Sequence, residues 1–267
     1  MLRFSVFLFL AVLMPSTGNI QTCLRGAGHK PRPTRERYLK ECTIYAKSAC
    51  CSADITKELA HSPVVKIDTT FWNRCGNLSS VCEAYMKKIE CFYRCSPYAV
   101  KWAHPKHAAA ISSVPICKKF CDDWYEACES DQTCVSNWLT DWEIDEKGEN
   151  HCKNECIPIS EMYANGTDMC EKMWGDSLKV SHSSCLCLNM DETDPKAIML
   201  IRGRVLGSSS SSSSSLTRSI NEDDVERFCQ FRLKKERELR NRIMAWQNTV
   251  VNIPVWCRLC SFILRGA

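Results

Sequence analysis

The sequence predicts an α+β fold that is mainly helical, has short strands and is rich in disulfides. Three features lead to this prediction: a dense set of cysteines, apolar residues at helical spacing, and only brief runs of strand-forming residues. Seventeen of the twenty cysteines lie between Cys23 and Cys187. This density is typical of proteins that fold in an oxidising compartment and use cross-links to support a modest core.

The N-terminus has the pattern of a secretory signal peptide over residues 1–18. Arg3 supplies a positive charge, Phe4–Met14 is apolar apart from Ser5, and small residues follow. The apolar run is too short to cross a membrane, and such a segment is removed from the mature protein. Since no later segment is long and apolar enough to span a membrane, we expect a secreted protein.

Composition divides the rest of the chain into three regions. Residues 19–190 form the cysteine-rich body, whose length suits one domain. Residues 191–221 include the serine run Ser208–Ser215, which cannot bury apolar surface, so we expect a linker there. Residues 222–267 form a basic C-terminal tail that we expect to be solvated. Nothing in the body marks a nucleic-acid-binding surface.

Two sets of residues have the spacing of one helix face. The first predicts a helix that opens after Pro115 and presents Cys117, Cys121, Trp124 and Cys128. The second predicts a helix that continues to Cys95 and presents Leu78, Cys82, Met86 and Ile89.

The remaining elements have weaker patterns. A third helix is predicted over Ser160–Trp174, interrupted by Asn165-Gly166, and Glu222–Trp246 has helical composition. Strands are predicted only as short runs, at Val64–Ile67 and Leu186–Leu188.

Cysteine pairs can also bind zinc. Zinc sites use a few pairs at short spacing, whereas this body has the adjacent Cys50 and Cys51 and many single cysteines. We therefore expect disulfides and no metal site. Cys257 and Cys260 form a CxxC pair, but no thioredoxin-like strand precedes it.

We expect that the protein is not an enzyme. Asp122, Asp123 and Asp141 carry carboxylates, but no His or Ser accompanies them at a spacing typical of acid–base or nucleophilic catalysis. His104 and His107 are three residues apart and could bind a metal, but the residues around them indicate a loop.

Aromatic residues are abundant in the body, and two explanations stay open. They could fill the core, because tryptophan is seldom left exposed. Alternatively, a wall of rigid rings could hold a flat heterocycle. The residues are Trp72, Trp102, Trp124, Trp138, Trp142 and Trp174, with Tyr93 and Tyr125.

Five segments carry a resemblance to a known family: Glu90–Pro97, Phe120–Cys128, Asn137–Trp142, Met162–Cys170 and Met173-Trp174. They resemble the folate receptor superfamily, in particular its riboflavin-carrying members. The likeness runs almost continuously to Met190 and then fades. It implies a folate-receptor-like domain with nine disulfides: Cys23–Cys50, Cys42–Cys91, Cys51–Cys95, Cys75–Cys156, Cys82–Cys128, Cys117–Cys187, Cys121–Cys170, Cys134–Cys152 and Cys185–Cys229.

The resemblance also implies a binding site and a function. Riboflavin would stack non-covalently, one per chain, between Tyr93 and Trp174. Trp138 and Trp142 match aromatic pocket positions, whereas Trp72 and Trp124 could contribute to the pocket or belong to the core. The implied function is vitamin transport and storage by a monomeric carrier without a catalytic cofactor. Its partner on cells would be an uptake receptor, such as that of an oocyte.

The residues that differ from the folate-binding members favour riboflavin. Those members hold the pterin amino group with an acid, where this chain has Ile89. They hold the glutamyl tail with basic side chains, at positions that match His107, Ala110, Leu139 and Thr140. Burying the carboxylates of a folate without cations is costly. Two alternatives stay open: a membrane-anchored folate or pterin receptor, and a ligand-free cell-adhesion member of the superfamily.

Two kinds of modification are predicted. Asn77-Leu-Ser and Asn165-Gly-Thr are glycosylation sequons, which are surface positions in a secreted protein. In the riboflavin-carrying members, phosphoserines mixed with glutamates follow the body and are linked to uptake. Because Ser208–Ser215 contains no acid, a phosphorylated uptake signal and a plain linker are both open.

Overall fold

The computed structural model describes residues 22–26, 28–209 and 222–251. Its α-helices are α1 (Ile55–Leu59), α2 (Ser80–Cys95), α3 (Lys118–Cys128), α4 (Ile159–Met162), α5 (Gly166–Lys172), α6 (Asp194–Ser209) and α7 (Glu222–Val251), with 3-10 turns at Thr43–Tyr45 and Ala99–Trp102. The strands are β1 (Lys66–Ile67), β2 (Thr70–Phe71), β3 (Val114–Ile116), β4 (Gln132–Thr133), β5 (Glu143–Ile144), β6 (Asn150–His151), β7 (Ile157–Pro158) and β8 (Leu178–Val180). The α+β prediction, mainly helical with short strands, is confirmed.

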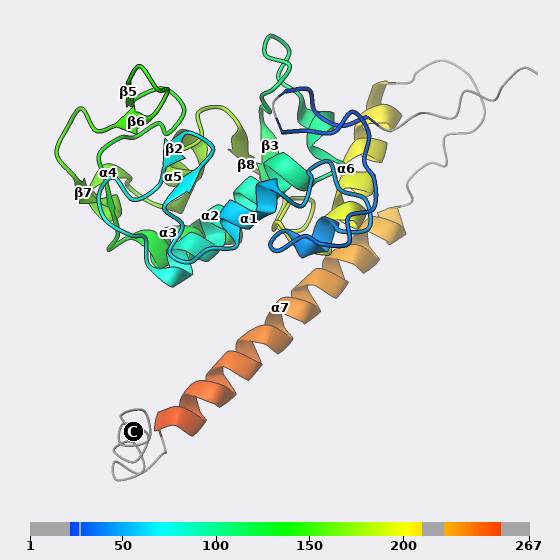
Figure 1. Ribbon diagram of the computed structural model, residues 1–267. Coiled ribbons are helices and arrows are strands. Elements are labelled where there is room, and N and C mark those ends of the chain that lie inside the picture. Colours follow the sequence, from blue (N-terminus) through cyan, green and yellow to red (C-terminus); the bar gives the residue numbers. More distant parts are fainter. Residues whose placement is uncertain (1–21, 27, 210–221, 252–267) are drawn as a thin grey trace, which may run out of the picture.

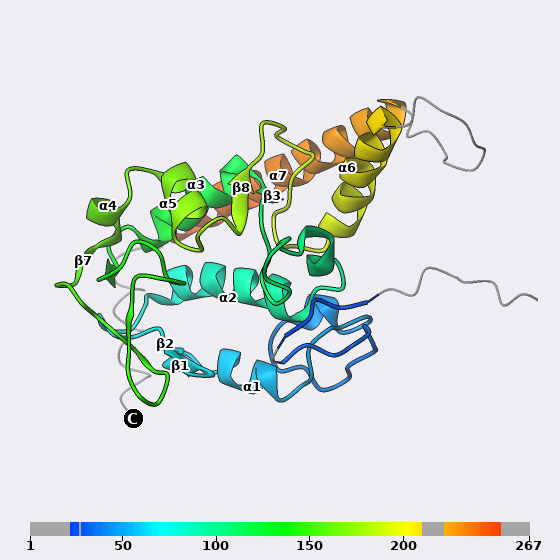
Figure 2. The same cartoon turned by 90° about the horizontal axis from the view of Figure 1, so that it is seen from above.

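The strands form four separate pairs rather than one sheet. β1–β2, β4–β7 and β5–β6 are antiparallel, and β3–β8 is parallel. Pairs this small have little stability of their own, so the fold depends on the helices and the disulfides. Figure 1 shows the body around α2 and α3, with α7 extending away from it; Figure 2 shows the same arrangement from above.

α2 forms where the cysteine spacing predicted a helix. Ser79 caps its N-terminus by accepting a hydrogen bond from the Cys82 amide at 3.3 Å, which satisfies one of the free donors of the first turn. The predicted apolar face is buried against the core. Glu83 is also buried. Its carboxylate forms an ion pair with Lys87 at 2.8 Å and accepts a hydrogen bond from the Val64 amide at 2.6 Å.

α3 and α5 pack closely because Gly166 begins α5. A Cβ atom at Gly166 would lie 2.4 Å from the Cys121 carbonyl oxygen of α3, so a side chain cannot be accommodated without moving a helix. The preceding Asn165 caps α5 by accepting a hydrogen bond from the Asp168 amide at 3.0 Å. The predicted third helix is thus two helices, α4 and α5, with the break where the Asn-Gly pair indicated it.

The strand predictions are only half right. Val64–Ile67 contains β1, but Leu186–Leu188 forms no strand and contributes a single bridge, between Leu188 and Ile116. The partner of β3 is instead β8, whose central Lys179 is exposed. A three-residue strand with one buried position carries almost no periodic signal, which explains why the pattern missed it.

Nine disulfides connect the described residues, and they join the same pairs that the family resemblance implies. Three of them involve α2. Cys82 joins it to α3, while Cys91 and Cys95 join its last turns to the N-terminal segment. Cross-links of this kind restrict the unfolded chain and so raise the stability of the folded one.

The region after the body differs from the expected linker and solvated tail. α6 occupies residues 194–209, with Ala197, Ile198 and Leu200 buried. α7 is fixed to the body by the Cys185–Cys229 disulfide and by Arg232. The signal peptide, Ser210–Ser215, Cys257 and Cys260 lie outside the described residues. No helix among the described residues is apolar over a length sufficient to cross a membrane.

Arg232 is a cation of the basic tail that the structure buries. Its side chain is 4% exposed and pairs with Asp194 at 2.9 Å. It also donates hydrogen bonds to the carbonyl oxygens of Cys185 (3.0 Å) and Cys187 (2.6 Å) and to the Thr193 hydroxyl (2.7 Å). Burial raises the pKa of the Asp194 carboxyl, and the Arg232 guanidinium opposes that shift. The Asp194 carboxyl therefore depends on Arg232 to stay ionised.

We predict that Arg232→Ala destabilises the docking of α7 by about 3–5 kcal/mol, because it leaves the Asp194 carboxylate buried without its partner. Arg227→Ala is the control. Arg227 lies one turn away on the same helix and pairs with Asp224 on the surface, so its loss should cost at most about 1 kcal/mol. Amide hydrogen exchange of residues 222–240 measures both effects. Equal protection in the two variants would contradict the role given to Arg232.

Candidate ligand-binding site

A cavity of about 240 Å³ lies between α2, the β1–β2 pair and three further segments, within residues 109–111, 138–139 and 174–178. Its apolar wall consists of Ile67, Ile89, Ala109, Ala110, Ile111, Leu139 and Leu178. Its aromatic residues are Trp72, Tyr93, Trp138 and Trp174, and its polar ones are Thr70, Glu90, Arg94 and Ser177. A mostly apolar cavity with a few convergent polar groups is the usual form of a small-ligand site.

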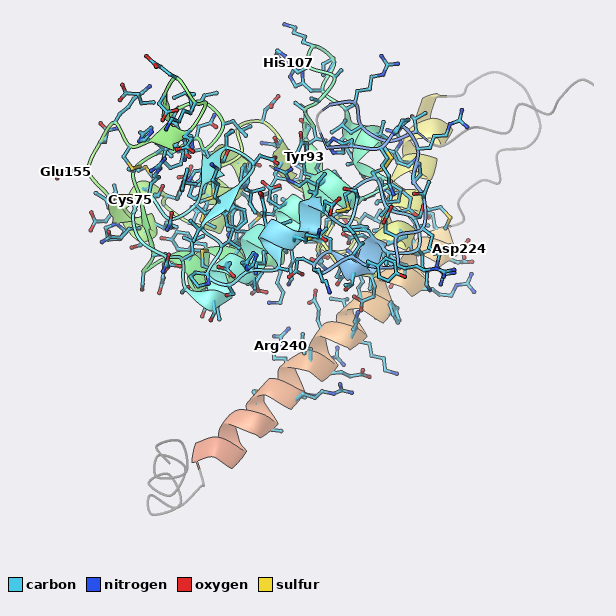
Figure 3. The ribbon with its side chains drawn as sticks, in the orientation of Figure 1. Cys75, Tyr93, His107, Glu155, Asp224 and Arg240 are labelled. Atoms are coloured by element: carbon cyan, nitrogen blue, oxygen red, sulfur yellow. A yellow bond between two sulfur atoms is a disulfide. The ribbon has the colours of Figure 1, made fainter. Side chains whose placement is uncertain are left out.

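Tyr93 projects into the cavity from the last turn of α2, between two disulfide-bonded cysteines. Its hydroxyl donates a hydrogen bond to the Ala109 carbonyl oxygen at 2.7 Å, so both ends of the side chain are fixed. Burial raises the pKa of this hydroxyl, which keeps it protonated as a donor. His29 contacts the ring edge-on with 5.1 Å between ring centroids, and its Nε2 donates to the Tyr93 carbonyl oxygen. Figure 3 shows Tyr93 inside the body.

Trp174 reaches the same cavity from the segment that follows α5. It packs against Trp138, with 6.0 Å between ring centroids and 54° between ring planes. Trp138 is held in turn by Trp142, which contacts it edge-on at 5.4 Å and donates a hydrogen bond to its carbonyl oxygen at 2.9 Å. Tyr93 and Trp174 are both half-buried, so part of each ring can still be covered by a ligand.

The other tryptophans divide between the cavity and the core. Trp72 and Trp138 are buried and line the cavity. Trp142 packs against Trp138 and does not line the cavity. Trp124 is fully buried on the inner face of α3, between the cross-linked Cys121 and Cys128, and contributes to the core. Of the six aromatic residues expected at the pocket, four therefore meet there.

Two indole N–H groups of the cavity have no partner. The Nε1 atoms of Trp138 and Trp174 are buried and donate no hydrogen bond to any described residue, and the same holds for Trp124 in the core. An unsatisfied buried donor costs about 1–3 kcal/mol.

Glu90 and Arg94 give the cavity a charged edge that the sequence analysis did not identify. Their side chains are 11% and 13% exposed and pair at 2.7 Å, and Arg94 also pairs with Asp68 at 2.8 Å. Although burial opposes it, the two carboxylates raise the pKa of Arg94. The guanidinium is thus already neutralised by two acids. The i, i+4 spacing of Glu90 and Arg94 within α2 is the sequence signal for this pair.

The positions that folate-binding members use for basic side chains carry none into this cavity. Ala110 and Leu139 line it without charge, and Thr140 is exposed. His107 is also exposed and lies at the tip of a protruding loop (Figure 3). Ile89 is buried in the wall, where those members have an acid.

Three clusters of described residues bring potential metal ligands close together, and their members already form disulfides, ion pairs or hydrogen bonds. Two clusters consist of disulfide-bonded cysteines, one of them with Asp131. A third joins Asp145, Glu149 and His151, but Glu149 pairs with Lys66 at 2.8 Å, and His151 pairs with Asp145 at 3.0 Å.

Both sequon asparagines, Asn77 and Asn165, are exposed. Asn165 uses its side-chain oxygen to cap α5, which leaves its amide nitrogen, the atom that a glycan would occupy, unused by the cap.

Comparison with known proteins identifies the family. A model of the Folate receptor family matches residues 22–189. The chain is 62% identical to the riboflavin-binding protein of Dromaius novaehollandiae over 198 residues, which cover 74% of this chain and 83% of that protein. It is 60% identical to the riboflavin-binding protein of Gallus gallus over the same shares. It is 32% identical to folate receptor alpha of Homo sapiens, over 62% of this chain and 66% of the receptor. The chain therefore belongs to the folate receptor family, as its five motif segments predicted.

Proposed function

We propose that this protein binds riboflavin non-covalently in the cavity and serves as its carrier in transport and storage. The observation that carries the proposal is that Tyr93 and Trp174, two half-buried rings from distant parts of the chain, line one apolar cavity. The relatives named riboflavin-binding proteins share about three fifths of their aligned residues with this chain, which supports the same ligand.

In the proposed complex the isoalloxazine ring stacks between Tyr93 and Trp174. Each aromatic contact would contribute about 0.5–1.5 kcal/mol beyond the apolar area that is buried. Because the Tyr93 hydroxyl is hydrogen-bonded to Ala109 and the Trp174 ring packs against Trp138, both rings are already positioned and binding loses little conformational entropy. The cavity, at about 240 Å³, is smaller than a typical closed ligand pocket of ~300–1,000 Å³. The ribityl chain would therefore extend from its mouth.

The polar groups of the cavity suit a neutral ligand with acceptor atoms. The hydroxyl groups of Thr70 and Ser177, which line the cavity, would donate to carbonyl or ring-nitrogen acceptors of the flavin. A folate would bring two carboxylates to a wall whose guanidinium is already paired with Glu90 and Asp68. Since an uncompensated buried charge is costly, folate should bind more weakly than riboflavin.

We propose carriage rather than catalysis. The cavity contains one carboxylate, Glu90, and that group is committed to Arg94, so neither residue is positioned as a free acid or base. The nine disulfides also support an oxidising compartment, and we propose a secreted, monomeric glycoprotein carrying glycans on Asn77 and Asn165. A cell-surface uptake receptor would be its protein partner.

Titration of the ligand-free protein distinguishes the proposed ligand from its rivals. We expect riboflavin to bind at least tenfold more tightly than folic acid, equivalent to about 1.4 kcal/mol. Riboflavin fluorescence should fall on binding, because a stacked ring has fast non-radiative decay, and tryptophan fluorescence reports folic acid. Tighter binding of folic acid would favour a folate receptor. Binding of neither would favour the ligand-free cell-adhesion alternative.

The Trp174→Ala variant tests the proposed stacking. We expect it to lose about 2 kcal/mol or more of riboflavin binding free energy, as is typical for a buried aromatic anchor, while Trp174→Phe should retain part of it. Tyr38→Ala removes a ring that is 75% exposed and remote from the cavity lining, and it should bind like the unmodified protein. Fluorescence titration gives the affinities, and near-UV circular dichroism checks folding. Unchanged affinity in folded Trp174→Ala would refute the sandwich.

A further inference from the structure

The charge of the body is distributed very unevenly. Residues 22–50, which we call the basic lobe, contain seven Lys or Arg against two Glu. Residues 51–190 contain fourteen Lys or Arg against twenty Asp or Glu. The net charge of residues 22–190 is therefore near zero because a positive lobe offsets the negative charge of residues 51–190. Figures 1 and 2 show the lobe, drawn in dark blue, gathered at one side of the body.

Most of the lobe's cations are free. Lys30 pairs with Glu36 at 2.8 Å, so one of the two acids is already used. The six remaining cations are exposed and form no ion pair with any described residue: Arg25, Arg32, Arg35, Arg37, Lys40 and Lys47. Elsewhere in the described body, basic side chains are commonly paired at close range, as Lys118, Lys119 and Lys172 are. Six unpaired cations therefore lie together in one small segment.

The lobe holds these cations in a fixed arrangement. Its two arms run antiparallel: Thr34 and Ala49 exchange backbone hydrogen bonds of 3.1 and 2.8 Å, and the Glu36 amide donates to the Ala46 carbonyl oxygen at 2.8 Å. This register puts Lys47 on one arm across from residues 35–37 on the other. The Cys23–Cys50 disulfide closes the lobe. The positive charge is thus carried on a backbone that is already ordered, so a partner does not have to order that backbone on binding.

We propose that the basic lobe is a docking surface for a sulfated polysaccharide. Four of the six free cations are arginines, whose planar guanidinium donates paired hydrogen bonds to tetrahedral oxyanions. A concentrated positive surface also steers polyanions toward it over long range. A single-stranded nucleic acid fits less well, because it needs several exposed aromatic rings for base stacking. Within residues 22–26 and 28–50, Tyr38 is the one exposed aromatic residue.

The surface is separate from the riboflavin cavity, and its proposed role does not rest on that ligand. None of the six free cations lines the cavity. The lobe touches the cavity wall through other residues: His29 contacts Tyr93, and Gly26 lies against Ala109. A carrier with this arrangement could be retained on a sulfated matrix while its cavity stays open to the vitamin.

The test compares two charge-matched variants of the full chain on immobilised heparin. The lobe variant is Arg32→Glu/Arg35→Glu/Arg37→Glu. The control, Lys147→Glu/Lys153→Glu/Lys196→Glu, changes three exposed lysines outside the lobe that have no ion pair among the described residues. Both variants change the net charge equally. At about 0.15 M salt, we expect the lobe variant to bind heparin at least about tenfold more weakly, and the control less than about twofold.

Four outcomes would overturn the proposal. The first is that the unmodified protein does not bind heparin at this salt concentration. The second is that both variants weaken equally, which would indicate net charge alone. Desulfated heparin binding as tightly as heparin would exclude recognition of sulfate. A single-stranded DNA oligomer that binds more tightly than heparin would indicate a nucleic-acid surface. Near-UV circular dichroism of both variants ensures that a loss of binding is not a loss of folding.

Discussion

The covalent anchoring of α2 is the constraint on which the rest of the body depends. Its first turn is cross-linked to α3 through Cys82. Its last turns are cross-linked through Cys91 to Cys42 of the basic lobe and through Cys95 to Cys51, just after the lobe. The four strand pairs could not fix the position of this helix, because each contains only two or three residues per strand. With α2 held at both ends, Tyr93 is placed against the cavity before any ligand arrives. The rigidity that binding requires is therefore a product of oxidative folding.

The cavity wall combines two environments that select for different parts of a ligand. Its aromatic and aliphatic faces gain free energy from any flat apolar ring that covers them. Its polar edge is more selective, because Arg94 is shared between Glu90 and Asp68 and has little capacity left for a further anion. The lining hydroxyl groups of Thr70 and Ser177 can hydrogen-bond to neutral polar atoms instead. These two environments are the basis on which we propose a large neutral heterocycle rather than an anionic one.

The sequence predicted the helices whose pattern is local, but it could not predict which buried residues reach the cavity, because that depends on tertiary packing. The cysteine spacing located α2 and α3 because a helix repeats its buried face every three or four residues. The same pattern could not separate Trp124, a core residue, from Trp138, a cavity residue, since both are buried and only the tertiary arrangement brings one of them to an empty space. The connectivity of the cysteines needed the family resemblance as well, because spacing allows many pairings. Glu90 and Arg94 both lie in the motif segment Glu90–Pro97. The pairing of Arg94 with a second acid could not be predicted, because Asp68 comes from a separate loop.

The arginines of this protein differ in burial and pairing, and the net charge of a segment did not predict which of them are buried and which are exposed. The excess of basic residues in the tail suggested a solvated segment, yet Arg232 is buried because Asp194 and three backbone or hydroxyl oxygens surround it. The arginines of the basic lobe form no ion pair with any described residue, and they stay exposed although the body as a whole is nearly neutral. An arginine becomes structural where the fold supplies acceptors, and it stays available for a partner where the fold supplies none. By that criterion Arg25, Arg32, Arg35 and Arg37 form a concentrated group of available cations, and none of them lines the cavity.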